Sequence, residues 1–128
     1  MGPVSHSDGD ALYHAVTDAI LGALALPDIG QLFPDTAAEN EGRDSALFLE
    51  EAVKQANERG WGVVNVDATV VLQRPKISGH KQAMRENLAR LLGVPIERVN
   101  VKGRTGERVD AVGEGRAVDA HAVLLLGR

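Results

Sequence analysis

The sequence predicts an α/β (α+β) fold, in which helices pack on one face of a mixed β-sheet within a single domain spanning residues 1–128. Three features predict this class: an apolar stripe with helical spacing near the start, a run that alternates with period two after residue 61, and a second alternating run at the end. The 128 residues are 44% hydrophobic, which is enough for one hydrophobic core and needs no second domain.

The first predicted helix begins near Asp8 and ends at Pro27. Asp8 or the serine before it can cap the first turn, because a short side-chain oxygen accepts a hydrogen bond from a free amide. Proline cannot continue a helix, so Pro27 marks its end. The stripe that we expect to face the core consists of Leu12, Ala15, Val16, Ala19, Ile20, Ala23 and Leu24.

His14 lies almost opposite this stripe, so we expect its imidazole to point away from the core. Asp10 and Asp18 lie one turn before and one turn after it. A carboxylate can orient one ring nitrogen of a histidine while the other nitrogen binds a metal ion. The same spacing also fits a solvated helix face, where a His–Asp pair contributes only about 0.2–0.5 kcal/mol. Spacing alone leaves both interpretations open.

Two prolines and a glycine in residues 27–36 predict an ordered connection to a second helix. We expect Asp44 to cap this second helix and Gly60 to end it. Its apolar positions are Ala46, Leu47, Leu49, Ala52, Val53 and Ala56.

From Trp61 to Leu72 the hydrophobic period changes to two, which predicts a long central strand that ends before Pro75. One side of this strand is expected to hold Val64, Val66, Ala68, Val70 and Leu72. A third helix follows and ends at Gly93. One side of that helix is expected to hold Ala83, Met84, Asn87, Leu88 and Leu91. The remaining predicted elements are a turn (95–98), a short strand (99–102), a glycine-rich loop (103–115) and a final strand (116–126).

The composition argues against several classes of partner. A net charge of −4 and scattered basic residues argue against nucleic acid, and no apolar run approaches the length needed to span a membrane. The chain has no cysteine, so it has neither disulfides nor a thiolate nucleophile, which is compatible with a cytoplasmic location. Because the strands carry apolar residues on more than one face, we expect self-association to bury what the helices cannot cover.

Six sequence blocks stand out by their order and spacing. They are His6-Ser7-Asp8-Gly9-Asp10, His14, Asp28-Ile29-Gly30, Phe33-Pro34-Asp35-Thr36, Arg74-Pro75-Lys76 and Asn100-Val101-Lys102. Taken together, these blocks resemble the 2-C-methyl-D-erythritol 2,4-cyclodiphosphate synthase family. The resemblance extends from His6 to Leu126.

This resemblance implies a homotrimer with active sites at subunit interfaces, acting as a lyase in the non-mevalonate pathway of isoprenoid biosynthesis. The implied substrate is 4-diphosphocytidyl-2-C-methyl-D-erythritol 2-phosphate, whose 2-phosphate attacks the diphosphate, closes a ring and expels CMP. Such a reaction depends on positioning and charge neutralisation more than on a protein nucleophile. The resemblance also implies a zinc ion on the diphosphate and a second metal, magnesium or manganese, on the phosphates.

The resemblance implies a role for each matching residue. His14 would bind zinc, Glu107 would hold the second metal, and His6 and Thr105 would stabilise the transition state. His6 and Ser7 would also bind the phosphate on the erythritol. The erythritol side of the pocket would be lined by Asp28, Ile29, Gly30, Phe33, Pro34, Asp35, Thr36 and Ala37. Cytosine would lie against Leu72, Gln73, Arg74, Pro75, Lys76, Ile77 and Ser78. The diphosphate would meet a loop formed by Arg104, Thr105, Gly106 and Glu107.

The sequence also departs from the family pattern, and these departures leave an alternative open. Members of the family begin with a strand carrying Asp-x-His, which supplies two further metal ligands, so we expect this chain to be N-terminally shortened. Arg104 stands where the family has a threonine, and the segment 108–113 is shorter than usual and lacks a phenylalanine and an arginine. The alternative is a non-catalytic trimeric module that binds cytidine nucleotides and has lost the metal site. The six blocks disfavour a generic α/β scaffold.

Overall fold

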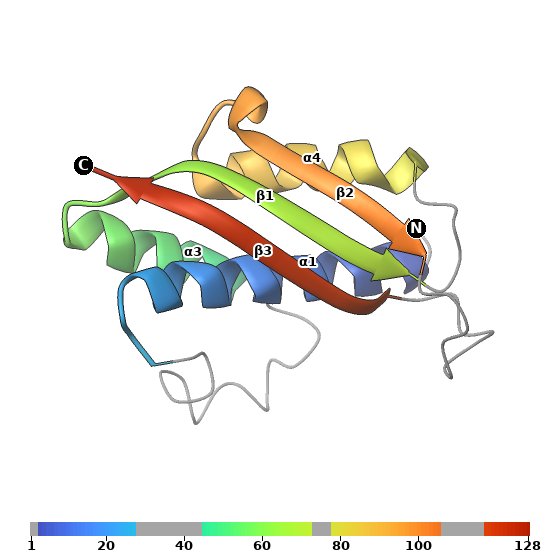
Figure 1. The fold of residues 1–128 in the computed structure, drawn as a ribbon, viewed down its shortest axis with the longest axis horizontal. Coiled ribbons are helices and arrows are strands. Elements are labelled where there is room, and N and C mark those ends of the chain that lie inside the picture. The colour runs from blue at the N-terminus through green and yellow to red at the C-terminus, as the bar shows by residue number, and fades with distance from the viewer. Residues whose placement is uncertain (1–2, 28–44, 73–77, 106–116) are drawn as a thin grey trace.

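A computed structural model describes residues 3–27, 45–72, 78–105 and 117–128 of the chain. Helices and strands follow one another in the predicted order, and the predicted mixed sheet with helices on one face is confirmed (Figure 1). The elements are α1 (Pro3–Ala23), α3 (Ser45–Glu58), β1 (Gly62–Leu72), α4 (Ser78–Leu92), a 3-10 helix (Ile96–Arg98), β2 (Val99–Thr105) and β3 (Ala117–Gly127).

The sheet has the strand order β2-β1-β3, so β1 is the central strand, as predicted. β1 runs parallel to β2 and antiparallel to β3. Parallel neighbours need a crossover connection, and here α4 provides it between β1 and β2. In Figure 1 the helices lie behind the sheet, and among the described residues no element covers its front face, which we call the bare face.

The hydrophobic core lies between the helices and the covered face of the sheet. Leu12, Val16 and Ile20 of α1 are fully buried, as predicted. Ala23 of the predicted stripe is exposed, and Leu21 is buried although it was not predicted. The covered face of the sheet contributes Val66, Ala68, Val70, Val99 and Val101, each at most 2% exposed. In the described part of the chain, no helix combines the length and the apolar character needed to cross a membrane.

A β-bulge interrupts the alternation near the start of β1. Val63 pairs with Leu126 and Asn65 with Leu125, so Val64 is an extra residue in the β1–β3 ladder. An extra residue reverses the side on which the following side chains point. Val63 and Val66 are therefore both buried, whereas Val64 is 36% exposed. The prediction that Val64 shares a face with Val66 is wrong for this reason.

Two element boundaries also differ from the prediction. α1 begins at Pro3 rather than near Asp8, because the fixed φ of proline suits the first helical turn without a side-chain cap. β2 continues to Thr105 rather than ending at Lys102. Its last residues pair with the end of β1, so the glycine-rich loop begins later than predicted.

Two helices bury a different stripe from the predicted one. In α3, Leu47 is 56% exposed and Phe48 is buried in its place. In α4, Ala83 and Asn87 are exposed. The buried positions of α4 are Met84, Leu88, Ala89 and Leu92. Apolar residues at adjacent positions allow two overlapping stripes, and packing against the sheet decides between them.

All three described helices end with the same pair of hydrogen bonds, the Schellman motif. In α3 and α4, the residue in the left-handed conformation is the predicted stop, Gly60 (φ 84) or Gly93 (φ 72). In α1 that position is Ala25, with φ 60. The Leu26 N–H donates to Leu21 at 2.8 Å and the Ala25 N–H donates to Gly22 at 3.0 Å. α1 thus ends at Ala23, four residues before Pro27, and is followed at position 25 by a side chain where glycine is favoured.

Ala25→Gly is expected to raise the free energy of unfolding by about 0.5–1 kcal/mol, because glycine adopts positive φ without the steric cost that alanine bears. Urea denaturation of the purified protein measures this change. Ala23→Gly is the matched control: at the last helical position, the same change should lower stability by about 0.5–1 kcal/mol. Equal effects of the two substitutions would contradict the assignment of strain to Ala25.

Candidate active site

The carboxyl ends of β1 and β2 meet at one edge of the sheet. Leu72, the last residue of β1, pairs in register with Thr105, the last residue of β2. Arg104 lies opposite Val71, and its side chain is exposed. Open sheets commonly bind ligands beyond the carboxyl ends of parallel strands. The structure therefore brings together the starts of two segments that were predicted as site segments.

Three further predicted site residues, His6, Ser7 and His14, lie in α1. His6 precedes His14 by eight residues, which is just over two helical turns and places them on neighbouring parts of one helix face. Along the long axis of Figure 1, the N-terminal end of α1 lies at the same end of the molecule as the arrowheads of β1 and β2. The start of α1, which carries His6 and Ser7, thus lies at the end of the molecule where β1 and β2 finish, whereas His14 lies in the middle of the helix.

His14 does not point freely into solvent, so the predicted orientation needs correction. Its side chain is half-buried, and its ring centroid lies 6.3 Å from that of Phe48, with the ring planes tilted by 35°. The physical reason is that α3 packs against α1 and brings Phe48 beside His14. Asp18, one turn further on, is exposed.

Many predicted site residues fall outside the described residues, so the structure does not place them. They are Asp28, Ile29, Gly30, Phe33, Pro34, Asp35, Thr36, Ala37, Gln73, Arg74, Pro75, Lys76, Ile77, Gly106 and Glu107. For Ser78, the first residue of α4, the backbone position is described. Asp44, the predicted cap of α3, also lies outside. Within the described ranges, no three His, Asp or Glu side chains gather into a metal site. His14 is one predicted ligand within these ranges, whereas a catalytic zinc usually has three protein ligands.

The structure reveals one positioning residue that sequence reasoning missed. Arg85 of α4 donates from Nε to the carbonyl of Val99 at 2.7 Å and from Nη2 to the carbonyl of Ile96 at 3.1 Å. These bonds tie the crossover helix to the point where β2 begins. The only sequence signal for this role is an arginine on the inner side of an amphipathic helix. That signal does not identify the backbone carbonyls that accept its hydrogen bonds.

A second missed feature lies on the bare face of the sheet. Asp67 accepts hydrogen bonds from Asn100 at 3.0 Å and from Lys102 at 3.1 Å, across the parallel β1–β2 ladder. The hydrogen bond from Lys102, followed by that from Asn100, lowers the pKa of the Asp67 carboxyl below its ordinary value of 3.8. The motif Asn100-Val101-Lys102 therefore has a structural partner in β1, which the sequence could not specify without the strand register.

A model of the YgbB family matches residues 1–127. The chain is 54% identical over 127 residues to the chloroplastic 2-C-methyl-D-erythritol 2,4-cyclodiphosphate synthase of Catharanthus roseus, covering 99% of this chain and 54% of that protein. It is 53% identical over 125 residues to the synthase of the same name from Rhodopirellula baltica, covering 98% of this chain and 75% of that protein.

A solved structure of 2C-methyl-D-erythritol-2,4-cyclodiphosphate synthase in its CDP-bound form is similar to this fold. It superposes with a TM-score of 0.80 at 40% identity, covering 95% of this chain and 79% of that one. The chain spans about half the length of the first plant relatives that it matches, and 75–80% of the bacterial synthases from Rhodopirellula baltica and Chromobacterium violaceum.

Arg85→Gln is expected to lower the free energy of unfolding by about 1–3 kcal/mol, because two backbone carbonyls lose charged donors in a half-buried setting. Urea denaturation checks this value. Arg90→Gln, on the exposed side of the same helix, is the control and should change stability by no more than about 0.5 kcal/mol. A neutral effect of Arg85→Gln would contradict its role in holding the start of β2.

The lowered pKa of Asp67 leads to a prediction about pH. A carboxyl whose pKa is lower in the folded state stabilises the fold above its unfolded pKa, and this stabilisation is lost as pH falls through the folded pKa. As the pH falls below about 4, the free energy of unfolding should therefore decrease more steeply for the unsubstituted protein than for the Asp67→Asn variant. Carboxyl ¹³C titration should place the pKa of Asp67 below 3.8, and Lys102→Met should raise it. An unchanged pKa in Lys102→Met would refute the assigned cause.

Proposed function

Because this chain belongs to the YgbB family, we propose that it converts 4-diphosphocytidyl-2-C-methyl-D-erythritol 2-phosphate to 2-C-methyl-D-erythritol 2,4-cyclodiphosphate with release of CMP. It would thus act as a lyase in non-mevalonate isoprenoid biosynthesis. The observation that carries this proposal is sequence identity of 50–54% over 94–99% of the chain with proteins that bear the name of this synthase. A single cyclodiphosphate-synthase-like domain over residues 1–128 is part of the proposal.

The chemistry asks for little covalent participation by the protein. An oxygen of the 2-phosphate attacks the phosphorus of the diphosphate that is bonded to the erythritol, and a new P–O–P linkage forms. The bond from that phosphorus to the bridging oxygen breaks, and CMP leaves with the electron pair. The protein has to align the two phosphate groups and neutralise their charge. A chain without cysteine, rich in small polar residues at its predicted site, suits this task.

The end of the β1–β2 pair would hold the nucleotide and the diphosphate. Leu72 begins the stretch proposed to bind cytosine, and it lies in register with Thr105, the proposed transition-state stabiliser. Arg104 precedes Thr105, and its exposed guanidinium can bind phosphate oxygens in a bidentate manner. The position of these residues at adjacent strand ends supports a shared pocket for the CDP portion of the substrate.

The remaining assignments follow from the family resemblance. His6 and Ser7 would bind the erythritol phosphate, and His6 would also stabilise the transition state. The residues Asp28–Gly30 and Phe33–Ala37 would line the erythritol side. His14 would be a zinc ligand, and Glu107 would hold magnesium or manganese. These metals would supply electrostatic stabilisation of the phosphates, and the remaining zinc ligands would come from outside the described residues.

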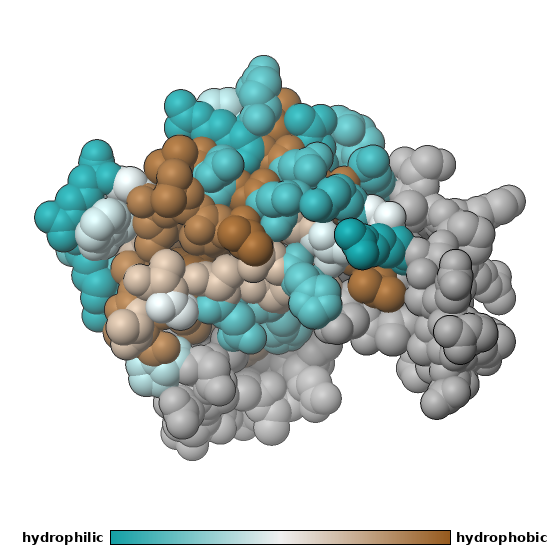
Figure 2. Space-filling view, viewed as in Figure 1, coloured by the Kyte–Doolittle hydropathy of each residue, from teal (hydrophilic) through white to brown (hydrophobic). Residues whose placement is uncertain are grey.

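We further propose that the protein is a homotrimer that uses the bare face of the sheet and acts in the cytoplasm. On this face Val123 is 73% exposed, Leu125 is 58% exposed and Val64 is 36% exposed. Figure 2, viewed onto the bare face, shows hydrophobic side chains gathered over the end of the sheet where β3 finishes. Exposed apolar patches of this kind support burial against another copy of the chain.

The alternative is a non-catalytic trimeric module that binds cytidine nucleotides. Two sequence features favour it: Arg104 stands where the family has a threonine, and the segment 108–113 is shorter than usual. The two functions differ in a direct way, because the module would bind CDP without bound zinc and without release of CMP.

The proposed activity is tested by zinc content and CMP release, measured together on the purified chain with the erythritol substrate and excess magnesium. We expect about one zinc per chain and turnover. His14→Gln should lower zinc affinity and CMP release by at least about tenfold, since loss of even an outer-shell partner costs about 10–100-fold. Glu86→Gln, at an exposed position of α4, is the control and should retain both.

CDP binding distinguishes the two proposals. Folded protein that binds CDP but contains no zinc and releases no CMP would contradict the enzyme and favour the module. Folded protein that neither binds CDP nor releases CMP would refute both.

A further inference from the structure

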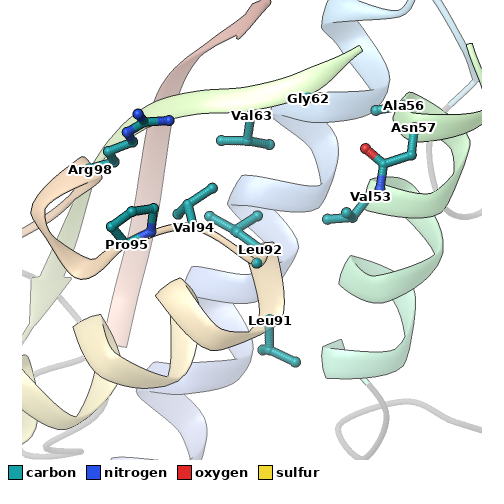
Figure 3. Close-up of a pocket in the computed structure, with 11 residues that line it drawn as sticks. Val53, Ala56, Asn57, Gly62, Val63, Leu91, Leu92, Val94, Pro95 and Arg98 are labelled. Atoms are coloured by element: carbon teal, nitrogen blue, oxygen red, sulfur yellow. The ribbon is translucent and has the colours of Figure 1, made fainter. Parts of the chain in front are cut away.

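A cavity of about 370 Å³ lies where α3 and α4 end and β1 begins (Figure 3). This volume falls within the range of small-molecule sites, about 300–1,000 Å³. Its walls are mainly apolar side chains from three elements and the turn after α4. The apolar residues are Val53, Ala56, Val63, Leu91, Leu92 and Val94. Of these, Ala56, Val63 and Leu92 are at most 8% exposed, so the floor of the cavity is part of the core.

Two polar side chains reach the cavity from opposite sides. Figure 3 shows the guanidinium of Arg98 beside β1, and the carboxamide of Asn57 extending from α3. Both residues are exposed. Within the described residues, neither side chain takes part in a hydrogen bond or an ion pair. A guanidinium offers five N–H donors and no acceptor, so the cavity presents an unpaired cation at its rim.

The charge at the rim selects among possible occupants. The C-terminal ends of α3 and α4 also face this region, and helix ends of this kind carry partial negative charge. Several of their carbonyls, however, already accept the closing hydrogen bonds of the Schellman motifs. The full charge of Arg98 therefore favours an anion. Arg98 can neutralise one negative charge. A dianionic phosphate would carry a second negative charge, which the partial negative charges of the two helix C-termini would repel. A carboxylate, with a single negative charge, is therefore the better match.

The cavity lies far from the candidate active site. It contacts Gly62 and Val63 at the start of β1, whereas Leu72 and Thr105 lie at the other end of the strand. The 11 residues of β1, at about 3.3 Å each, separate the two regions by roughly 30 Å. The proposed cyclase reaction does not use the cavity.

We propose that this cavity is a binding site for a small monocarboxylate with an apolar body, of about the size of a medium-chain fatty acid. The apolar body lies against Val53, Val63, Leu91 and Val94, and the carboxylate accepts hydrogen bonds from the guanidinium of Arg98 at the rim. Such a ligand has about ten non-hydrogen atoms, which sets its expected Kd on the order of 1 mM.

The test uses the full chain and sodium octanoate as the probe, with methyl ¹H–¹³C NMR as the readout. Octanoate should shift the methyl signals of Val53, Val63, Leu91 and Val94 in a saturable manner. The cation octylammonium should bind at least about fivefold more weakly. Octanol, which is neutral, should bind through its apolar chain alone.

Variants at the rim test the role of the charge. Arg98→Gln should raise the Kd of octanoate by about three- to fivefold, as expected for an exposed ion pair, and should leave the Kd of octanol within about twofold. Arg98→Lys should restore most of the affinity. Arg90→Gln, which removes the same charge from α4 rather than from the 3-10 helix, should leave octanoate binding unchanged. Circular dichroism verifies that each variant is folded.

Three outcomes would overturn the proposal. The first is the absence of shifts at these methyl groups at 10-fold the expected Kd. The second is an equal loss of octanoate affinity in Arg98→Gln and Arg90→Gln, which would reflect overall charge. The third is a set of shifts confined to Val123 and Leu125, which would place the ligand on the bare sheet face. None of these outcomes depends on whether the chain has cyclase activity.

Discussion

The pairing of β1 on both of its edges is the constraint on which the rest of the structure depends. A strand hydrogen-bonded on both sides cannot slide without breaking two ladders, so its register fixes the positions of β2 and β3. Its parallel pairing with β2 requires α4 as a crossover, and Arg85 of α4 holds the point where β2 starts. As a consequence, Leu72 and Thr105 meet at one edge of the sheet.

Sequence patterns correctly predicted the features that depend on local backbone geometry. They failed for features that depend on contacts between different helices and strands. The alternation of β1 and the helical stops at Gly60 and Gly93 follow from backbone periodicity and from the conformational freedom of glycine. The bulge at Val64 arises from pairing with β3, and a single inserted residue has no signature in a run of valines. The exposure of Leu47 likewise depends on where α3 meets its neighbours.

The sequence predicted which residues belong to the candidate site, but not how their side chains are arranged relative to one another. Periodicity placed His14 on a helix face but could not reveal that Phe48 lies beside it, because the packing angle of α1 and α3 is a tertiary property. The hydrogen bonds of Asp67 were missed for a similar reason: the partner of a β-strand residue depends on register. Chemical roles came from the family resemblance, since neither fold nor periodicity specifies a reaction.

The bare face of the sheet divides into an apolar part and a polar part, and this division affects any self-association. Burial of the exposed Val123 and Leu125 is favourable at about 25 cal/mol per Å² of apolar surface. A lone carboxylate on the same face would oppose burial, because a buried charge without partners is costly. Asp67 already accepts hydrogen bonds from Asn100 and Lys102 within one chain. Another copy can therefore cover the polar part without providing a counter-ion of its own, and the apolar part supplies the driving force for association.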